Sequence, residues 1–155
     1  MPHFLSTLLN PERFQGHGRN RSYFEGWYFK LVSVQGRSLA VIPGIAFDET
    51  GEGHTFIQVL DGNRKTSRYL KFPVASFRAA TDRFLVTVGG SVFSGDSVTL
   101  NIEGLEGTVT LRETVGWPKP WYSPGIMGPF SFIPFMECYH GIVSMDHQLN
   151  GILKN

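Results

Sequence analysis

The sequence predicts an all-β domain, built as an antiparallel barrel or a barrel-like sandwich. Three features favour this class. Short apolar and aromatic stretches recur from residue 22 onward, glycine and aspartate turn signals separate them, and no long helical pattern supplies a crossover between parallel strands. We therefore expect residues 1–21 to form an N-terminal lead-in and residues 22–155 to form one β domain, which includes a long proline- and aromatic-rich segment.

The expected strands follow one another in chain order, with turn signals between them. They cover residues 22–33, 38–47, 54–60, 67–72, 84–88, 91–93, 97–102 and 105–112, and a last pair covers 139–146 and 149–153. Gly89-Gly90 is the clearest two-residue hairpin signal, because glycine adopts the positive φ angles that such turns require. Short helical turns are expected at 4–9 and 74–80.

Large side chains occupy both faces of the first expected strand. One face carries Tyr23, Glu25, Trp27, Phe29 and Leu31, and the other carries Phe24, Gly26, Tyr28, Lys30 and Val32. Alternate residues of a strand point to opposite faces, and in a barrel or sandwich only one face is interior. We therefore expect a second domain, a partner chain or the segment 117–136 to cover the outer face.

Composition excludes several classes of protein. Of the 155 residues, 17% are charged and 14% are aromatic, which excludes intrinsic disorder. A formal net charge of +1 gives no basic field for nucleic acid. Cys138 is the single cysteine, so an internal disulfide and a multi-cysteine zinc site are excluded. No apolar run is long enough for a transmembrane segment, so we expect a cytoplasmic protein or one peripheral to a membrane.

The segment 117–136 is the least regular part of the sequence. It holds five prolines and six aromatic residues, and prolines at this density prevent both a helix and a central strand. Two interpretations stay open: the segment fills one end of the β domain as core, or it forms a ligand pocket or an interdomain contact. Its candidate pocket walls are Trp117, Trp121, Met127 and Phe135.

Glu25 is a candidate general acid. It lies between Tyr23 and Trp27 on one strand face, and burial there raises the pKa of a carboxyl group toward neutral pH. The competing interpretation is structural, because a buried glutamate commonly forms an ion pair with an arginine.

Glu137 and His140 are a second candidate pair, at the point where the segment 117–136 leads into the expected last strands. Strand alternation places them on opposite faces, so joint catalysis requires a bulge or bend between them. His140, Asp146 and His147 match no metal-ligand spacing, and we expect neither a metal nor a cofactor.

Four motifs resemble the tocopherol cyclase family, whose wider relatives include lipocalin-like proteins and carotenoid hydratases. They are Tyr-Phe-Glu-Gly-Trp-Tyr-Phe-Lys at 23–30, Ser-Pro-Gly-Ile-Met-Gly at 123–128, Pro-Phe-Met-Glu-Cys-Tyr-His-Gly at 134–141 and Ser-Met-Asp-His at 144–147. The resemblance runs from about residue 10 to residue 151. It implies a lipocalin-like β fold with an apolar cavity. Family members continue into a second β-rich half, so it also implies that this chain is the N-terminal half of a longer protein.

The resemblance implies prenyl-lipid chemistry. Cyclising a prenyl quinol requires an acid that protonates an alkene, a dry cavity, and aromatic faces that stabilise the tertiary cation. Glu25 and Glu137 are then candidate acids and His140 a candidate proton partner. The candidate substrate-binding residues are Tyr23, Trp27, Trp117, Trp121, Met127 and Phe135. The alternatives are a non-catalytic lipid-binding or carrier module, and a structural half that assembles with a second β domain or as a homo-oligomer.

Overall fold

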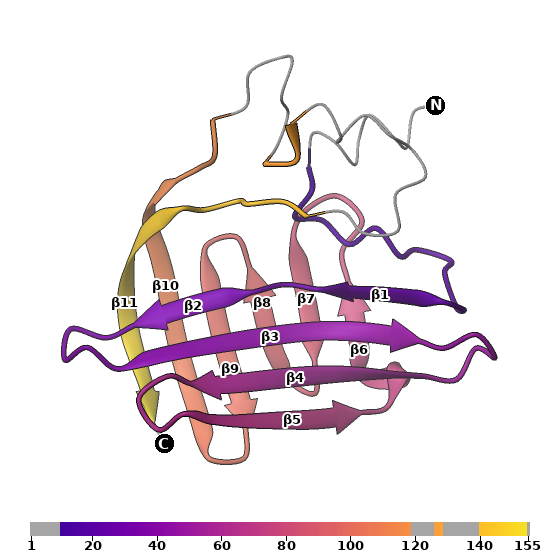
Figure 1. Ribbon diagram of the computed structural model, residues 1–155, viewed down its shortest axis with the longest axis horizontal. Helices are drawn as coiled ribbons and strands as arrows, with labels where there is room; N and C mark the ends of the chain where they lie inside the picture. Colours follow the sequence, from indigo (N-terminus) through magenta and orange to yellow (C-terminus); the bar gives the residue numbers. More distant parts are fainter. Residues whose placement is uncertain (1–9, 119–125, 129–139, 155) are drawn as a thin grey trace.

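A computed structural model describes residues 10–118, 126–128 and 140–154 of the chain. In these residues the strands form two antiparallel sheets (Figure 1). The first sheet contains β1 (Tyr23–Gly26), β2 (Phe29–Val32), β3 (Ser38–Phe47), β4 (Gly53–Asp61) and β5 (Thr66–Phe72). The second contains β6 (Phe77–Ala79), β7 (Leu85–Val88), β8 (Ser91–Ser94), β9 (Ser97–Ile102), β10 (Leu105–Val115) and β11 (Asp146–Lys154).

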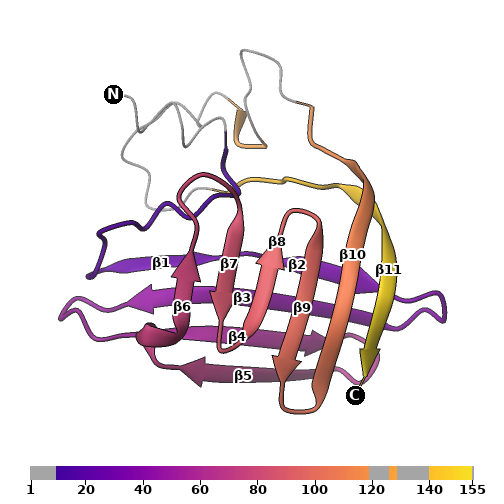
Figure 2. The same cartoon turned by 180° about the vertical axis from the view of Figure 1, so that it is seen from behind.

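The two sheets pack face to face, and the strands of one run across those of the other (Figures 1 and 2). The all-β prediction is therefore confirmed in the form of a sandwich, because the described strands form two separate sheets and no closed barrel. Apolar side chains from both sheets fill the space between them. The fully enclosed ones include Val41, Ile57, Val86, Val88, Phe93 and Val98.

The strand boundaries follow the turn residues closely. The strand expected at 38–47 is β3, and the one expected at 97–102 is β9, each with the same ends. Gly89 and Gly90 have φ angles of 55° and 87° and join β7 to β8, which confirms the hairpin predicted from this glycine pair.

β1 and β2 are two halves of one edge strand, which matches the single strand expected there. Gly26 pairs with Gly44 and Phe29 with Val41, so the register along β3 does not change between them. The Trp27 N–H donates to the Pro43 carbonyl at 3.0 Å, but proline has no N–H to donate in return. The strand is interrupted there because one hydrogen bond of the ladder cannot form.

The predicted faces of this edge strand are confirmed. Trp27 and Leu31 are 9% and 5% exposed and belong to the core, whereas Phe24 and Tyr28 are 67% and 63% exposed on the outer face.

Two predicted elements are wrong. Only Val74–Ser76 of the expected helix at 74–80 is helical, as a single 3₁₀ turn (η1), and the chain then enters β6, which pairs with β7. So short a helix has little stability of its own, and the open edge of β7 provides hydrogen bonds instead.

The hairpin expected at 139–146 and 149–153 is also wrong, although its second strand, 149–153, is confirmed as part of β11 (Asp146–Lys154). Residue 139 lies outside the described residues, residues 140–145 form no strand, and the rest is the single strand β11. β10 extends to Val115, three residues beyond the expected end at 112, and β11 pairs along most of its length. The helical turn expected at 4–9 lies outside the described residues.

In the part of the chain that the structure describes, no helix has the length and apolar character needed to cross a bilayer.

Candidate functional site

Glu25 lies on the sheet face that looks toward the second sheet, near the edge of the molecule. β1 places it opposite Ile45 of β3. The backbone N–H of Gln15 donates to both of its carboxylate oxygens, at 3.1 Å to Oε1 and 3.0 Å to Oε2. The Tyr23 hydroxyl donates a short hydrogen bond to Oε2. The carboxylate thus holds the N-terminal segment, residues 10–21, along β1.

Burial raises the pKa of Glu25 above its ordinary value, because the charged form loses hydration. Three hydrogen bonds act in the opposite direction, from the Tyr23 hydroxyl and the N–H groups of Gln15 and Gly16, without cancelling that rise. Among the described residues no arginine forms an ion pair with Glu25, so the ion-pair interpretation is wrong within this part of the chain. All the donors named here are neutral, which leaves the carboxyl group able to hold a proton.

Tyr23 links Glu25 to the N-terminal segment. Burial is the main cause of its raised pKa, and the hydrogen bond to Glu25 adds to it, so the phenol stays protonated and donates. The Arg19 guanidinium lies 5.8 Å from the centre of the Tyr23 ring. Gly16 is buried against the same ring: a Cβ atom at this position would lie 2.4 Å from Tyr23 Cε1. The segment passes this closely because residue 16 has no side chain.

Trp27 is a core residue at the inner end of the site. Its indole N–H donates to the Glu12 carbonyl at 2.8 Å. Its ring centre lies 6.3 Å from that of Phe14 and 5.7 Å from that of Phe84. The aromatic surroundings predicted for Glu25 are therefore present, and Phe14, which the sequence did not single out, is part of them.

Residues 140–145 run along the same edge of the molecule as the N-terminal segment (Figures 1 and 2). The His140 N–H donates to Met127 Sδ at 3.2 Å, and a Cβ atom on Gly141 would lie 3.0 Å from Pro11 Cβ. His140 is exposed, and Trp117 is half-buried just beyond β10. The structure thus brings His140 and Met127 close to the N-terminal segment, which contacts Glu25 and Trp27. Among the contacts of the described residues there is no hydrogen bond between His140 and Glu25. Glu137, Trp121 and Phe135 lie outside the described residues.

The described residues contain no group of three histidine, cysteine, aspartate or glutamate side chains that could hold a metal ion. His147 Nδ1 instead lies 3.1 Å from Ser144 Oγ, and the His147 N–H donates to Asp146 Oδ1 at 3.0 Å.

An aromatic row crosses the outer face of the first sheet. Phe24, Phe56 and Tyr69 stack in sequence, with ring centres 5.9 Å and then 4.9 Å apart. His54 Nε2 lies 2.9 Å from the Tyr69 hydroxyl. Phe56 is 2% exposed, but its neighbours Phe24 and Tyr69 are 67% and 46% exposed. The cover expected for this face is therefore not supplied by the described residues.

Two contributions to the site could not be identified in the sequence. Gln15 and Gly16 belong to a stretch that reads as an ordinary loop. Gln15 reaches Glu25 with a backbone N–H, a group that every residue except proline carries, so its side chain gives no signal.

Comparison with known proteins identifies no relative. No family model matches the sequence, no curated protein matches it, and no solved structure matches the fold. The resemblance to the tocopherol cyclase family therefore stays a prediction.

Proposed function

We propose that this chain binds a prenylated or isoprenoid lipid and contributes an acid to a cyclase-type reaction of a prenyl quinol, with Glu25 as the proton donor. One observation carries the proposal: a half-buried carboxyl group with a raised pKa is surrounded by aromatic rings and receives hydrogen bonds from neutral donors. The four sequence motifs support the same substrate class.

The reaction requires one proton to move out and one to return. Glu25 donates its proton to one carbon of a trisubstituted alkene, so a C–H bond forms, the π bond breaks and a tertiary cation remains. The phenol oxygen attacks the cation, a C–O bond forms, and the phenolic proton returns to the carboxylate. The Tyr23 hydroxyl and the Gln15 N–H stabilise the carboxylate between these steps.

Aromatic rings at the site favour the cationic intermediate. A desolvated cation–π contact stabilises a cation by about 2 kcal/mol. The rings of Tyr23 and Trp27 lie on the same strand face as Glu25, and Phe14 contacts both of them. Glu137 is the second candidate acid of this proposal, with His140 as a proton partner of either.

A single substitution tests the acid. Glu25→Gln should abolish conversion of a prenyl quinol while leaving binding intact, because the amide keeps the shape of the side chain but is no acid. Binding is measured by tryptophan fluorescence with the prenyl quinol, a chain-saturated analogue and a short-headgroup control. Glu106→Gln, which changes an exposed glutamate of β10, is the matched control. Full turnover in Glu25→Gln removes Glu25 as the acid.

The exposed aromatic row favours a second candidate function, a non-catalytic module that assembles through the outer face of the first sheet. Phe24 and Tyr28 lie on this outer face and are mostly exposed. Exposed apolar patches on a protein surface commonly mark sites of contact with another protein. If this function is correct, the double substitution Phe24→Ser and Tyr28→Ser should leave thermal stability nearly unchanged and abolish association with a second β domain or a second copy. Sedimentation that finds the unsubstituted chain monomeric, alone and with the candidate domain, contradicts it.

A further inference from the structure

A polar hollow lies at the end of the first sheet opposite to Glu25, where three turns meet. It is formed beside the β2–β3, β4–β5 and β9–β10 turns and has a volume of about 180 Å³. Its lining residues are Arg37, Leu39, Val59, Asp61, Arg64, Thr66, Arg68, Gly104 and Leu105. Three guanidinium groups therefore line the same small space as one carboxylate.

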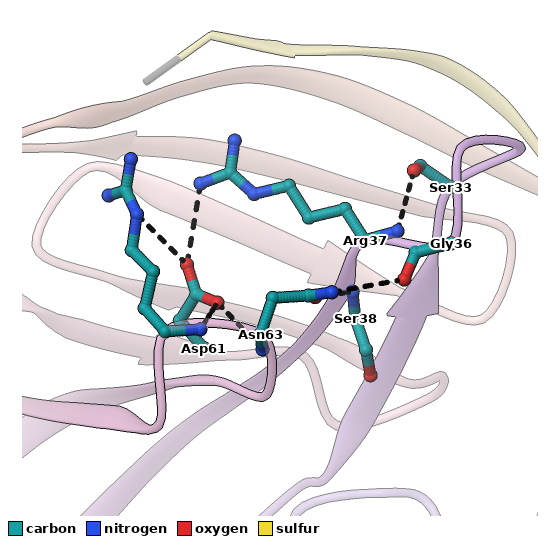
Figure 3. A network of polar contacts seen from close by, with 7 residues as sticks. Ser33, Gly36, Arg37, Ser38, Asp61 and Asn63 are labelled. Carbon is teal, nitrogen blue, oxygen red and sulfur yellow. Dashed lines mark hydrogen bonds and ion pairs between the residues drawn. The ribbon is translucent and has the colours of Figure 1, made fainter.

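Asp61 is fixed in place by the turn that follows it. The N–H groups of Asn63 and Arg64 donate to its Oδ1 at 3.1 and 2.9 Å. Its Oδ2 lies 3.4 Å from Arg37 Nη2 and 3.9 Å from Arg64 Nε (Figure 3 shows the Arg37 contact). The Asp61 side chain is 9% exposed, whereas those of Arg37 and Arg64 are 41% and 64% exposed. A buried carboxylate thus orients two guanidinium groups that solvent can still reach.

The same network fixes the two turns to each other. Asn63 Nδ2 donates to the Gly36 carbonyl at 3.4 Å, and the Ser38 N–H donates to Asn63 Oδ1 at 2.7 Å. Figure 3 shows Asn63, a residue of the β4–β5 turn, beside Asp61 and directed toward Gly36 of the β2–β3 turn. The arginines therefore project from a braced scaffold, which lowers the entropy cost of ordering them around a ligand.

Arg68 brings the third positive charge from β5 to the second sheet. Its Nη1 donates to the Glu103 carbonyl in the β9–β10 turn at 2.8 Å. The lining residues then carry three positive charges and one negative charge, because the Glu103 side chain does not line the hollow. Val59 and Leu105, each 4% exposed, form an apolar floor, and a poorly polarisable floor strengthens the attraction between charges above it.

We propose that this hollow binds a phosphate group, held by Arg37, Arg64 and Arg68 above the floor formed by Val59 and Leu105. The excess of two positive charges matches a phosphate dianion, and planar guanidinium groups pair well with phosphate oxygens. A water molecule occupies about 30 Å³ in the liquid, so the hollow has room for a phosphate group but not for a long lipid chain. The phosphate comes either from a free phosphate compound or from a lipid headgroup. Since Glu25 lies at the other end of the sheet, this site stands independently of the proposed acid.

The experiment is an amide NMR titration of the full chain with inorganic phosphate. We expect saturable shifts at Arg64, Arg68 and Gly104, and weaker binding as sodium chloride rises to about 0.5 M. Arg64→Gln and Arg68→Gln should each weaken binding at least about tenfold, since each removes a charged hydrogen-bond donor. Arg83→Gln, in the exposed turn before β7, should leave it unchanged.

The outcomes separate cleanly. No saturable shift, or equal binding by Arg64→Gln and Arg83→Gln, overturns the proposal. If Arg68→Gln fails to fold because its bond to Glu103 is lost, Arg64→Gln decides alone. Hexyl phosphate and vesicles of phosphatidic acid, compared with vesicles of phosphatidylcholine, identify the source. Tight binding of both hexyl phosphate and the phosphatidic acid vesicles identifies a lipid headgroup as the source. Binding of inorganic phosphate alone identifies a free phosphate compound.

Discussion

Glu25 and Asp61 are two carboxyl groups of one sheet with opposite chemistry. Glu25 pairs with Ile45 of β3, and Asp61 pairs with Leu39 of the same strand. The two pairing positions are therefore about 20 Å apart along β3. Both accept backbone N–H groups. Burial dominates at Glu25 and raises its pKa, whereas at Asp61 the N–H of Arg64, followed by Arg37 and the N–H of Asn63, holds the pKa below its ordinary value.

The difference shows which surroundings favour the protonated form of a carboxyl group and which favour the charged form. Neutral donors fix the position of Glu25 without forcing it to ionise, and the aromatic surroundings disfavour its charge. At Asp61 the backbone N–H of Arg64 and the Arg37 guanidinium favour the charged form, so this carboxylate anchors the surrounding turn. Four measurements test this contrast.

Asp61→Ala should have the largest effect on stability. It removes the acceptor of two backbone N–H groups and leaves Arg37 and Arg64 repelling each other without a carboxylate between them. We expect the midpoint of thermal unfolding to fall by on the order of 10 °C. Asp82→Ala is the control, because Asp82 and Arg83 form an exposed ion pair, and it should change the midpoint by less than about 1 °C. Equal effects of the two substitutions would mean that Asp61 does not anchor the turn.

Gly16→Ala should be the next largest, because it separates the N-terminal segment from Glu25. The new Cβ would lie 2.4 Å from Tyr23 Cε1 and 2.6 Å from Phe14 Cζ, so these rings have to move. We expect a loss of about 1–3 kcal/mol in the free energy of unfolding, measured by urea titration. Gly95→Ala, where nothing lies within 4 Å of the new Cβ, is the matched control. No difference between the two variants contradicts the close packing around Glu25.

The two carboxyl groups should give pH dependences of opposite sign. The folded pKa of Glu25 lies above its ordinary 4.5, so its contribution to stability is complete at low pH and is lost as pH rises through the folded pKa. The folded pKa of Asp61 lies below its ordinary 3.8, so its contribution is present above that value and is lost as pH falls. Free energies of unfolding of Glu25→Gln and Asp61→Asn, each subtracted from the unsubstituted chain across pH 3 to 8, measure both. If the two differences change in the same direction as pH rises, the contrast is wrong.

Tyr23→Phe should have the smallest effect. The Tyr23 hydroxyl bond lowers the pKa of Glu25, so its removal should raise that pKa further. Carboxyl ¹³C NMR of Glu25 reports the change directly. Tyr28→Phe, on the outer face, is the control and should leave the Glu25 titration in place. A fall in the pKa would show that the hydroxyl is not a donor to the carboxylate.

Local sequence predicts the strands well and the sites only in part. Turn glycines such as Gly89 and Gly90 require one backbone conformation, so the ends of β7 and β8 could be read directly. The alternation of side chains between the two faces of the first strand also identified the inner face, which carries Glu25 and Trp27. β6 was expected to be helical, and the strand expected at 149–153 is present only as part of the longer β11. Each of these strands pairs with an open edge, that of β7 or β10, and an open edge is a property of the assembled sheet.

The arginine hollow had no signal in the sequence. Arg37, Arg64 and Arg68 come from separate strands and turns, and they meet Leu105 of the second sheet only once the sheets have packed. Asp61-Gly62 could be recognised as a turn, but which charges the turn would gather depends on that packing.

Pro43 divides the edge strand of the first sheet into two halves, β1 and β2. Because the ladder lacks a hydrogen bond beside Trp27, β1 and β2 are attached to β3 by two separate short stretches. Backbone amides of the two stretches should therefore exchange with deuterium at unequal rates. We expect β1 to separate from β3 by local unfolding, together with the N-terminal segment. Leu31 of β2 would meanwhile stay over the core. Glu25 lies on β1, so such local opening would displace this carboxyl group while the rest of the sandwich stays folded.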